Sequence, residues 1–382
     1  MSQADFLRQM PNYGADNLSR RDSLWQRLHI DPWLLILLLM LTVFGLAVLY
    51  SAGGQTMGPV TRQGRFLLIA YVGMLIVAQF DVERIKRLAP MAYLLGLVLL
   101  VAVVFFGVGA KGAQRWLSVG GFRFQPSEIM KLVVPMMVAW YFASRALPPK
   151  LRYIATGLII IVLPTVLIAK QPDLGTSILI AASGLFVLFL AGISWRFILG
   201  AAGILLLSFY PLWHFVLHDY QKQRILTMLS PGSDRLGAGW NIIQSKTAIG
   251  SGGWGGKGWL NGTQSQLDFL PESHTDFIIA VLAEEWGLKG VLLLLALYIG
   301  IIARGLWIGM HAQHCFGRLL AGSITLTFFV YVFVNMGMVS GLLPVVGVPL
   351  PLVSQGGTSL VTLLAGFGLL MAISTEKRVI GQ

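Results

Sequence analysis

The sequence predicts an all-α polytopic membrane protein with about ten transmembrane helices. Its 382 residues are 56% hydrophobic and only 12% charged, whereas soluble domains carry about 25% charged residues. The mean hydropathy is +0.75. Apolar runs recur that are long enough to cross roughly 30 Å of hydrocarbon, which takes about 20 helical residues. Because a helix satisfies its own backbone hydrogen bonds in lipid, these runs predict helices.

The apolar runs follow one another with short connections, apart from one long loop. In chain order, the predicted spans are 33–51, 66–80, 89–108, 127–143, 154–169, 174–191, 197–217, 287–305, 318–338 and 359–375. A half-length apolar helix is expected at about 276–286, leading into the eighth span. The expected organisation is therefore an N-terminal arm (1–32), a transmembrane domain (33–375) with a large extracytoplasmic loop between spans seven and eight (218–275), and a tail (376–382).

Lysine and arginine indicate the orientation. They concentrate in the N-terminal arm and in the loops at 84–87 and 145–152, which alternate correctly for the cytoplasmic side. Both termini are therefore expected in the cytoplasm. The net charge of +12 does not suggest a nucleic-acid partner, because the cations lie in short loops where they face anionic lipid headgroups.

The first polar segment that stands out is 112–131. Its alternation of large apolar residues with small or polar ones is expected of an interfacial loop, and Pro126 favours a helix start. Glu128 and Lys131 then lie three residues apart, a spacing that allows them to pair. Two interpretations stay open: a buried ion pair that fixes helix packing, or a cation lining a polar cavity, with Arg115 and Arg123 positioned for an anionic headgroup or pyrophosphate.

The second segment, 170–177, is a tight turn between two predicted spans. Its proline and glycine are ordinary turn residues, and Asp173 is a good helix cap. Lys170 and Asp173 nevertheless place two ionisable groups at membrane depth, where such groups by default indicate a functional site.

The third segment closes the long loop and ends at an apolar helix. Its glycine-rich part, 250–259, lacks the phosphate-loop pattern and instead predicts flexibility or a close approach of backbone. Glu272, His274 and Asp276 follow. Thr275 or Asp276 is a suitable cap for the next helix, whereas ionisable groups at a membrane edge favour function. No second histidine stands at ligand spacing, so a zinc site is not expected.

The fourth segment, 341–359, contains prolines and glycines that prevent a regular helix next to the bilayer. Irregular backbone at that depth is tolerated where it is buried in protein or lines a polar cavity. The hydroxyls of Ser354 and Ser359 and the free amides between them can bind anionic oxygens. All four segments fall on the extracytoplasmic side of the ten-span arrangement, which predicts a single site.

At these residues the chain resembles the RodA/FtsW/SpoVE family, the SEDS proteins of bacterial envelope growth. The motifs are GAQRW at 112–116, QPSE at 125–128 with Lys131, QPDLGTS at 171–177, FLPE and HTDF within 269–277, and GVPLPLVS with GG within 347–357. The resemblance covers about Asp31 to Thr375. The stretches at 236–246 and 262–272 resemble members of cell elongation more than those of division. Gln355 departs from the pattern, since the family usually carries tyrosine there.

The resemblance implies a peptidoglycan glycosyltransferase of the bacterial inner membrane. Its substrate would be lipid II, a disaccharide-pentapeptide on an undecaprenyl pyrophosphate carrier, polymerised at the extracytoplasmic face. Implied partners are a class B penicillin-binding protein and the rod-complex proteins MreC and MreD. A divalent cation, magnesium or manganese, is implied as well, with ligands that the sequence does not identify.

By family analogy Asp276 is the general base that takes the proton of the attacking sugar hydroxyl. Arg115, Lys131 and Lys170 are then candidates for stabilising the leaving pyrophosphate, and Glu128 orients Lys131. The further residues expected to bind substrate or line the cavity are Asp173, Glu272, His274, Ser354 and Ser359. The alternative is a flippase or transporter of lipid-linked precursors, which composition alone fits equally well. Replacing Asp276 by alanine separates the two, since it ends polymerisation but spares transport.

Overall fold

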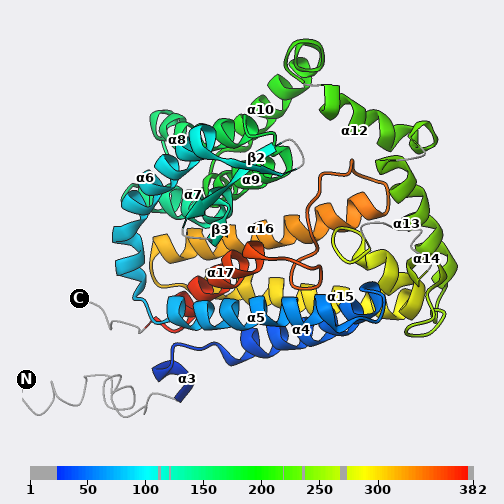
Figure 1. Cartoon of the computed structure of the whole chain (residues 1–382). Helices are drawn as coiled ribbons and strands as arrows, with labels where there is room; N and C mark the ends of the chain where they lie inside the picture. Colours follow the sequence, from blue (N-terminus) through cyan, green and yellow to red (C-terminus); the bar gives the residue numbers. More distant parts are fainter. Residues whose placement is uncertain are drawn as a thin grey trace, which may run out of the picture.

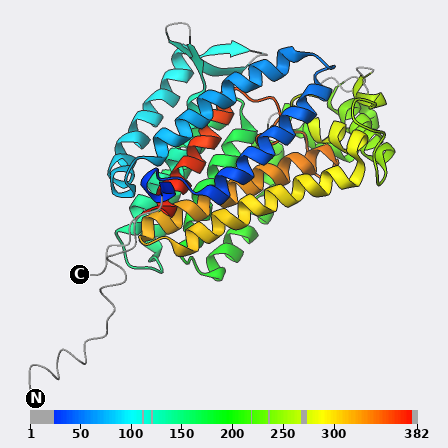
Figure 2. The same cartoon turned by 90° about the horizontal axis from the view of Figure 1, so that it is seen from below.

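A computed structural model describes residues 24–110, 113–119, 122–217, 219–234, 237–266 and 273–376. Long helices lie side by side in a bundle, as Figures 1 and 2 show, which confirms the predicted all-α class. The helices are α3 (Leu24–Arg27), α4 (Pro32–Ala52), α5 (Met57–Ala78), α6 (Val82–Phe106), α7 (Pro126–Ala143), α8 (Leu151–Ala169), α9 (Leu174–Leu190), α10 (Trp195–Leu207), α11 (Phe209–Pro211), α12 (Asp219–Leu229), α13 (Ala238–Gly252), α14 (Thr263–Gln266), α15 (Ile278–His311), α16 (Cys315–Val339) and α17 (Thr358–Ser374). A π-helix η1 (Leu212–Val216) and a 3₁₀ turn η2 (Pro231–Ser233) complete the helical elements.

Within the described residues, 6 helices are long and apolar enough to cross a membrane, namely α4, α5, α6, α8, α15 and α16. Helices α9 and α17 are apolar but shorter. The chain thus has the build of a multi-pass membrane protein. The number of ten crossings stays a prediction.

Helices α4 and α15 run antiparallel, which defines the two ends of the bundle. At one end, Arg304 of α15 pairs with Asp31, at 2.7 Å between Nη2 and Oδ2, while Asp31 also caps α4. At the other end, the Ser51 hydroxyl of α4 donates to the carboxylate of Glu285. The second end, called the site end here, also holds residue 273, since the Ser273 hydroxyl donates to the carbonyl of Ala52 at 3.2 Å.

A small antiparallel sheet at the site end replaces the expected interfacial loop. Strands β1 (Val108–Ala110), β2 (Ala113–Val119) and β3 (Phe122–Phe124) pair in the order β1-β2-β3. Leu117 lies opposite Phe124 and is only 7% exposed. The alternating aromatic and β-branched residues that indicated an interface are also the period-two pattern of strands.

Several predicted spans have different boundaries, and α6, for example, begins at Val82 rather than residue 89. Helix α5 begins at Met57 rather than residue 66. Within its polar first half the buried Gln63 bonds the backbone of Ser354 and Gly356, while Arg62 and Arg65 are exposed. The seventh span, predicted at 197–217, stops as α10 at Leu207. Pro211 lacks an N–H and cannot continue a regular helix. The predicted loop 218–275 also contains helices α12, α13 and α14.

Helix α15 confirms the expected half-helix, because it bends at Gly287 (φ 64°, ψ −160°). At this kink the backbone bonds of the helix are exchanged for bonds to the glycine-rich stretch. Leu288 N donates to Gly253 O at 2.9 Å rather than to Glu284 O, which instead accepts from Lys257 N at 3.0 Å. In the same way, Lys289 N pairs with Trp254 O, and Glu285 O accepts from Gly258 N.

The glycines permit this contact. A Cβ on Gly256 would lie 2.1 Å from the carbonyl oxygen of Glu285, a distance no side chain tolerates. Close approach of backbone, one of the two expected roles of the glycine-rich stretch, is therefore what the structure uses. The buried carboxylate of Glu284 anchors the far side of the stretch by accepting from Lys257 Nζ at 2.7 Å and Thr263 N at 2.8 Å.

Candidate active site

Asp276 lies at the site end, two residues before α15. Phe277 is the N-cap residue of that helix, and this position has no side-chain capping bond, so neither Thr275 nor Asp276 stands at the N-cap. The carbonyl of Asp276 accepts from Asn335 Nδ2 of α16 at 2.9 Å. Its carboxylate is partly exposed and faces Gly347, where an added Cβ would lie 3.6 Å from Oδ2.

The irregular segment 341–357 folds back over the residues around Asp276. Gln355 N donates to His274 O at 3.0 Å. The Ser354 hydroxyl donates to Thr275 O and accepts from Leu350 N. Ser354 is 1% exposed, and its hydroxyl holds this turn together at the wall of the cavity described below. The third and fourth polar segments therefore meet, as the sequence predicts.

The Glu128–Lys131 pair forms on α7, with 2.6 Å between Oε1 and Nζ. Thr362 of α17 donates to the other carboxylate oxygen at 3.2 Å. The ammonium of Lys131 also stands over the ring of Tyr331 on α16, 5.1 Å from its centroid. Both charged side chains are about nine-tenths buried. The pair thus joins three helices.

A mostly apolar cavity opens beside this pair. Its walls come from α7, α16, α17 and the loop at 349–356, and they include Lys131, Thr327, Tyr331, Pro349, Ser359 and Thr362. Lys131 is half of a buried ion pair and also lines a cavity, which is mostly apolar rather than polar as the second interpretation had it. Asp276 is not among the lining residues, but it lies close along α16: Tyr331 contacts Lys131, and Asn335, one turn further, contacts Asp276.

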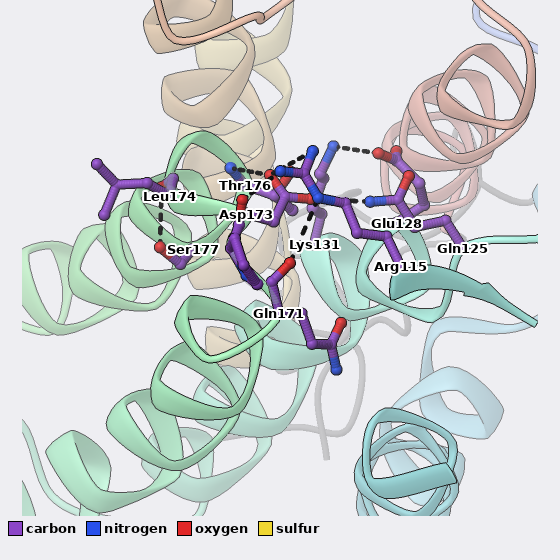
Figure 3. A network of polar contacts seen from close by, with 10 residues as sticks. Arg115, Gln125, Glu128, Lys131, Gln171, Asp173, Leu174, Thr176 and Ser177 are labelled. Atoms are coloured by element: carbon purple, nitrogen blue, oxygen red, sulfur yellow. Dashed lines mark hydrogen bonds and ion pairs between the residues drawn. The ribbon is translucent and has the colours of Figure 1, made fainter. Parts of the chain in front are cut away.

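Arg115 of β2 braces the turn of the second segment. Its Nε donates to Gln171 O at 3.4 Å, and its guanidinium bonds Pro172 O and lies 3.8 Å from Asp173. Figure 3 shows the guanidinium directed at this turn. Asp173 also caps α9, accepting from Thr176 N at 3.3 Å, and accepts from Gln125 Nε2 at 2.9 Å. Arg115 and Asp173 therefore join the first and second segments.

The remaining predicted residues are less engaged. Lys170 is exposed at the end of α8, and His274 contributes its carbonyl to the fold. Glu272 lies outside the described residues. In the part of the chain that the structure describes, no group of three or more His, Cys, Asp or Glu side chains is placed to hold a metal ion. The described residues therefore do not form a protein-ligated metal centre, and the magnesium or manganese requirement stays a prediction.

Four functional neighbours were not predicted from the sequence. Asn335 holds Asp276, Tyr331 and Thr362 contact the ion pair, and Gln63 fixes the loop at 354–356. Asn335 and Gln63 are polar residues inside otherwise apolar helices, which is a signal that the sequence offers. Tyr331 and Thr362 carry no such signal, since both residue types are common in membrane helices.

Comparison with known proteins places most of the chain in one family. The model of the cell cycle protein family FtsW/RodA/SpoVE matches residues 32–379. The peptidoglycan glycosyltransferase MrdB of Escherichia coli K12 is 55% identical over 96% of this chain and 99% of its own length. The probable peptidoglycan glycosyltransferase FtsW of Trichlorobacter lovleyi is 37% identical, with 91% and 94% covered.

Solved structures of similar proteins match most of the chain as well. A chain from a study of how a peptidoglycan synthase complex coordinates polymerisation and crosslinking is 29% identical and has a TM-score of 0.81, with 91% of this chain and 98% of that one covered. The rod shape determining protein RodA of Thermus thermophilus is 26% identical with a TM-score of 0.69, covering 91% and 97%. With the motifs meeting at one end of a matching bundle, this chain belongs to the FtsW/RodA/SpoVE family.

Proposed function

We propose that this chain is a peptidoglycan glycosyltransferase that polymerises lipid II during cell elongation. The observation that carries the proposal is the placement of Asp276, whose backbone carbonyl accepts a hydrogen bond from Asn335 of α16, the helix that also lines the cavity containing Lys131. The similarity to MrdB over nearly the whole chain supports the same reaction.

Chain extension joins a sugar hydroxyl to an anomeric carbon. In our proposal the carboxylate of Asp276 accepts the proton of the attacking hydroxyl as the new C–O bond forms. The bond from the anomeric carbon to the pyrophosphate breaks at the same time, and its electron pair leaves with the undecaprenyl pyrophosphate. A positioned base of this kind typically contributes about 10²–10⁴-fold.

Lys131 is the best-placed cation for the departing pyrophosphate, because it lines the cavity while Glu128 and Tyr331 fix its position. Preorganised charge in a site that excludes water is effective since it needs no reorganisation during the reaction. Arg115 directs its donors at the 171–173 turn, so we assign it to shaping the site. Lys170 is exposed at the same end and is available to attract an anionic headgroup.

The proposal includes a place in the cell. The basic loops support an orientation with both termini in the cytoplasm, and the substrate chemistry supports the bacterial inner membrane with the site facing outward. The chain from the peptidoglycan synthase complex supports a crosslinking partner, a class B penicillin-binding protein. The rod-complex proteins MreC and MreD, and magnesium or manganese, complete the proposal, and a chelator should then stop polymerisation.

The test is glycan formation from purified lipid II by the chain co-purified with its penicillin-binding partner, whose transpeptidase is blocked. We expect long glycans from the wild type and none from Asp276→Ala. Asp81→Ala is the matched control, because Asp81 is an exposed carboxylate at the opposite end, and it should polymerise normally. Equal polymer from Asp276→Ala would overturn the assignment of the base, and no polymer from wild type with metal supplied would favour the transporter.

A further inference from the structure

Asn335 is a fully buried amide near the site end of α16, with 0% of its surface exposed. Its Nδ2 donates to the carbonyl oxygen of Asp276 at 2.9 Å and to that of Val348 at 2.7 Å. An amide nitrogen carries two hydrogens, so both are used. Because both acceptors are backbone carbonyls, only the nitrogen can face them, which fixes the orientation of the amide.

These two bonds tie together the backbone segments that define the surroundings of the carboxylate. Asp276 stands on one of them. Val348 stands on the other, directly after Gly347, which the carboxylate faces. The Asn335 side chain therefore bonds both the segment that carries the base and the segment that the carboxylate faces.

The oxygen of the amide adds no further hydrogen bond. Asn335 Oδ1 is buried and has no hydrogen-bond partner among the described residues, a condition that costs about 1–3 kcal/mol. Apolar residues surround this position along α16. An unsatisfied buried group in a native protein calls for an explanation, and here the two donor bonds to the site segments supply one.

We propose that Asn335 is a positioning residue for Asp276: it holds the carboxylate at the distance from Gly347 that the attacking hydroxyl needs. This inference rests on the proposed function and deepens its base-catalysed step. Asn335 does not touch the reacting atoms in this account. A displacement of about 1 Å at a reacting group lowers the rate about 100-fold, so loss of the two bonds should act on kcat.

The test compares Asn335→Asp with a matched loss of a buried hydrogen bond on the same helix. The aspartate has the size of asparagine but, when ionised, no hydrogen to donate. The control is Ser323→Ala: Ser323 is also 0% exposed, and its hydroxyl donates to Ser183 O of α9 at 2.6 Å, outside the site. Each variant is measured with the penicillin-binding partner for kcat and for KM toward lipid II, and for thermal unfolding.

We expect kcat of Asn335→Asp to fall about 100-fold with KM within about twofold of wild type, while Ser323→Ala keeps both constants. A kcat within about threefold of the control, or a raised KM with unchanged kcat, would overturn the proposal. If Asn335→Asp does not fold, Asn335→Ala is judged by the same criterion. Failure of both to fold beside a folded Ser323→Ala would assign Asn335 to the fold itself, and inactivity of wild type would instead remove the proposed function.

Discussion

At the residue scale, the Glu128–Lys131 pair combines structure and chemistry, and the two can be separated. Both side chains are about nine-tenths buried, and removing one partner of a buried pair typically destabilises by about 3–5 kcal/mol. We therefore expect Glu128→Gln and Lys131→Met each to lower the free energy of unfolding and the activity. The double variant Glu128→Gln/Lys131→Met should recover much of the stability, because apolar or neutral pairs replace buried ions well.

Activity of that double variant distinguishes the two roles. If Lys131 stabilises the leaving pyrophosphate, polymerisation stays low although the protein is stable. Thermal unfolding in detergent and glycan yield from lipid II give the two readouts. A stable double variant that polymerises like wild type would show that the pair acts only in packing.

Gly347 provides a second prediction at this scale. Its φ of +75° lies in the left-handed region, and a Cβ would stand 3.6 Å from Asp276 Oδ2. Gly347→Ala adds backbone strain of roughly 1–2 kcal/mol and places a methyl group where the acceptor hydroxyl must arrive. We expect kcat to fall by at least about tenfold, since misplacement at the reacting group acts on the rate.

The control is Gly192→Ala. Gly192 has a similar φ of +87° but lies between α9 and α10, against Pro148. Its alanine variant should suffer similar strain and keep its kcat. Equal activity of the two variants would remove the role of Gly347 in shaping the space before the carboxylate.

At the element scale, the kink of α15 and the glycine-rich stretch form one unit. Gly287 has a backbone conformation (φ 64°, ψ −160°) that is essentially restricted to glycine, and a Cβ there would lie 2.4 Å from Gly256 N. Gly287→Ala should therefore break the exchanged hydrogen bonds, lower the yield of folded protein and displace Asp276. Gly300→Ala on the same helix meets only the flexible side chain of Leu37 and should fold normally; equal folding of both would contradict the importance of the kink.

How far the sequence predicts these elements depends on which signal they carry. The apolar runs predicted the all-α class and most of the long helices. A half-length apolar run also predicted the helix before Gly287. The start of α5 was missed because hydropathy cannot see that Gln63 is satisfied by the loop at 354–356. The sheet was missed because the alternation of 113–124 fits both an interfacial loop and strands.

The candidate site was also predicted only in part. Convergence of the polar segments followed from helix order alone, and the contacts of Arg115 with the 171–173 turn and of Gln355 with His274 bear it out. The individual partners did not follow, because a hydrogen bond between residues 59 positions apart, such as Asn335 to Asp276, leaves no mark in either local pattern. The sequence also did not show that the Ser354 hydroxyl bonds Thr275 O and Leu350 N within the turn, at the wall of the cavity.

At the scale of the whole molecule, an ion pair joins two helices at the end of the bundle opposite the site. Asp31 and Arg304 join α4 to α15 far from the site, with Asp31 only 4% exposed. Asp31→Asn keeps a good helix cap but removes the charge, so we expect it to lower the free energy of unfolding by about 1–3 kcal/mol. Its kcat should equal that of wild type. Thermal unfolding and polymerisation rates measure the two effects, and a large loss of kcat would contradict the separation of the two ends.

The most direct test of Asp276 as the general base is the rate of glycan formation by Asp276→Asn at saturating lipid II. Asparagine preserves the size and the backbone contact to Asn335 but cannot accept the hydroxyl proton. We expect a folded variant, equal to wild type in thermal unfolding, whose kcat is lower by about 10²–10⁴-fold. A variant that polymerises at the wild-type rate would contradict the account, because another group would then have to serve as the base.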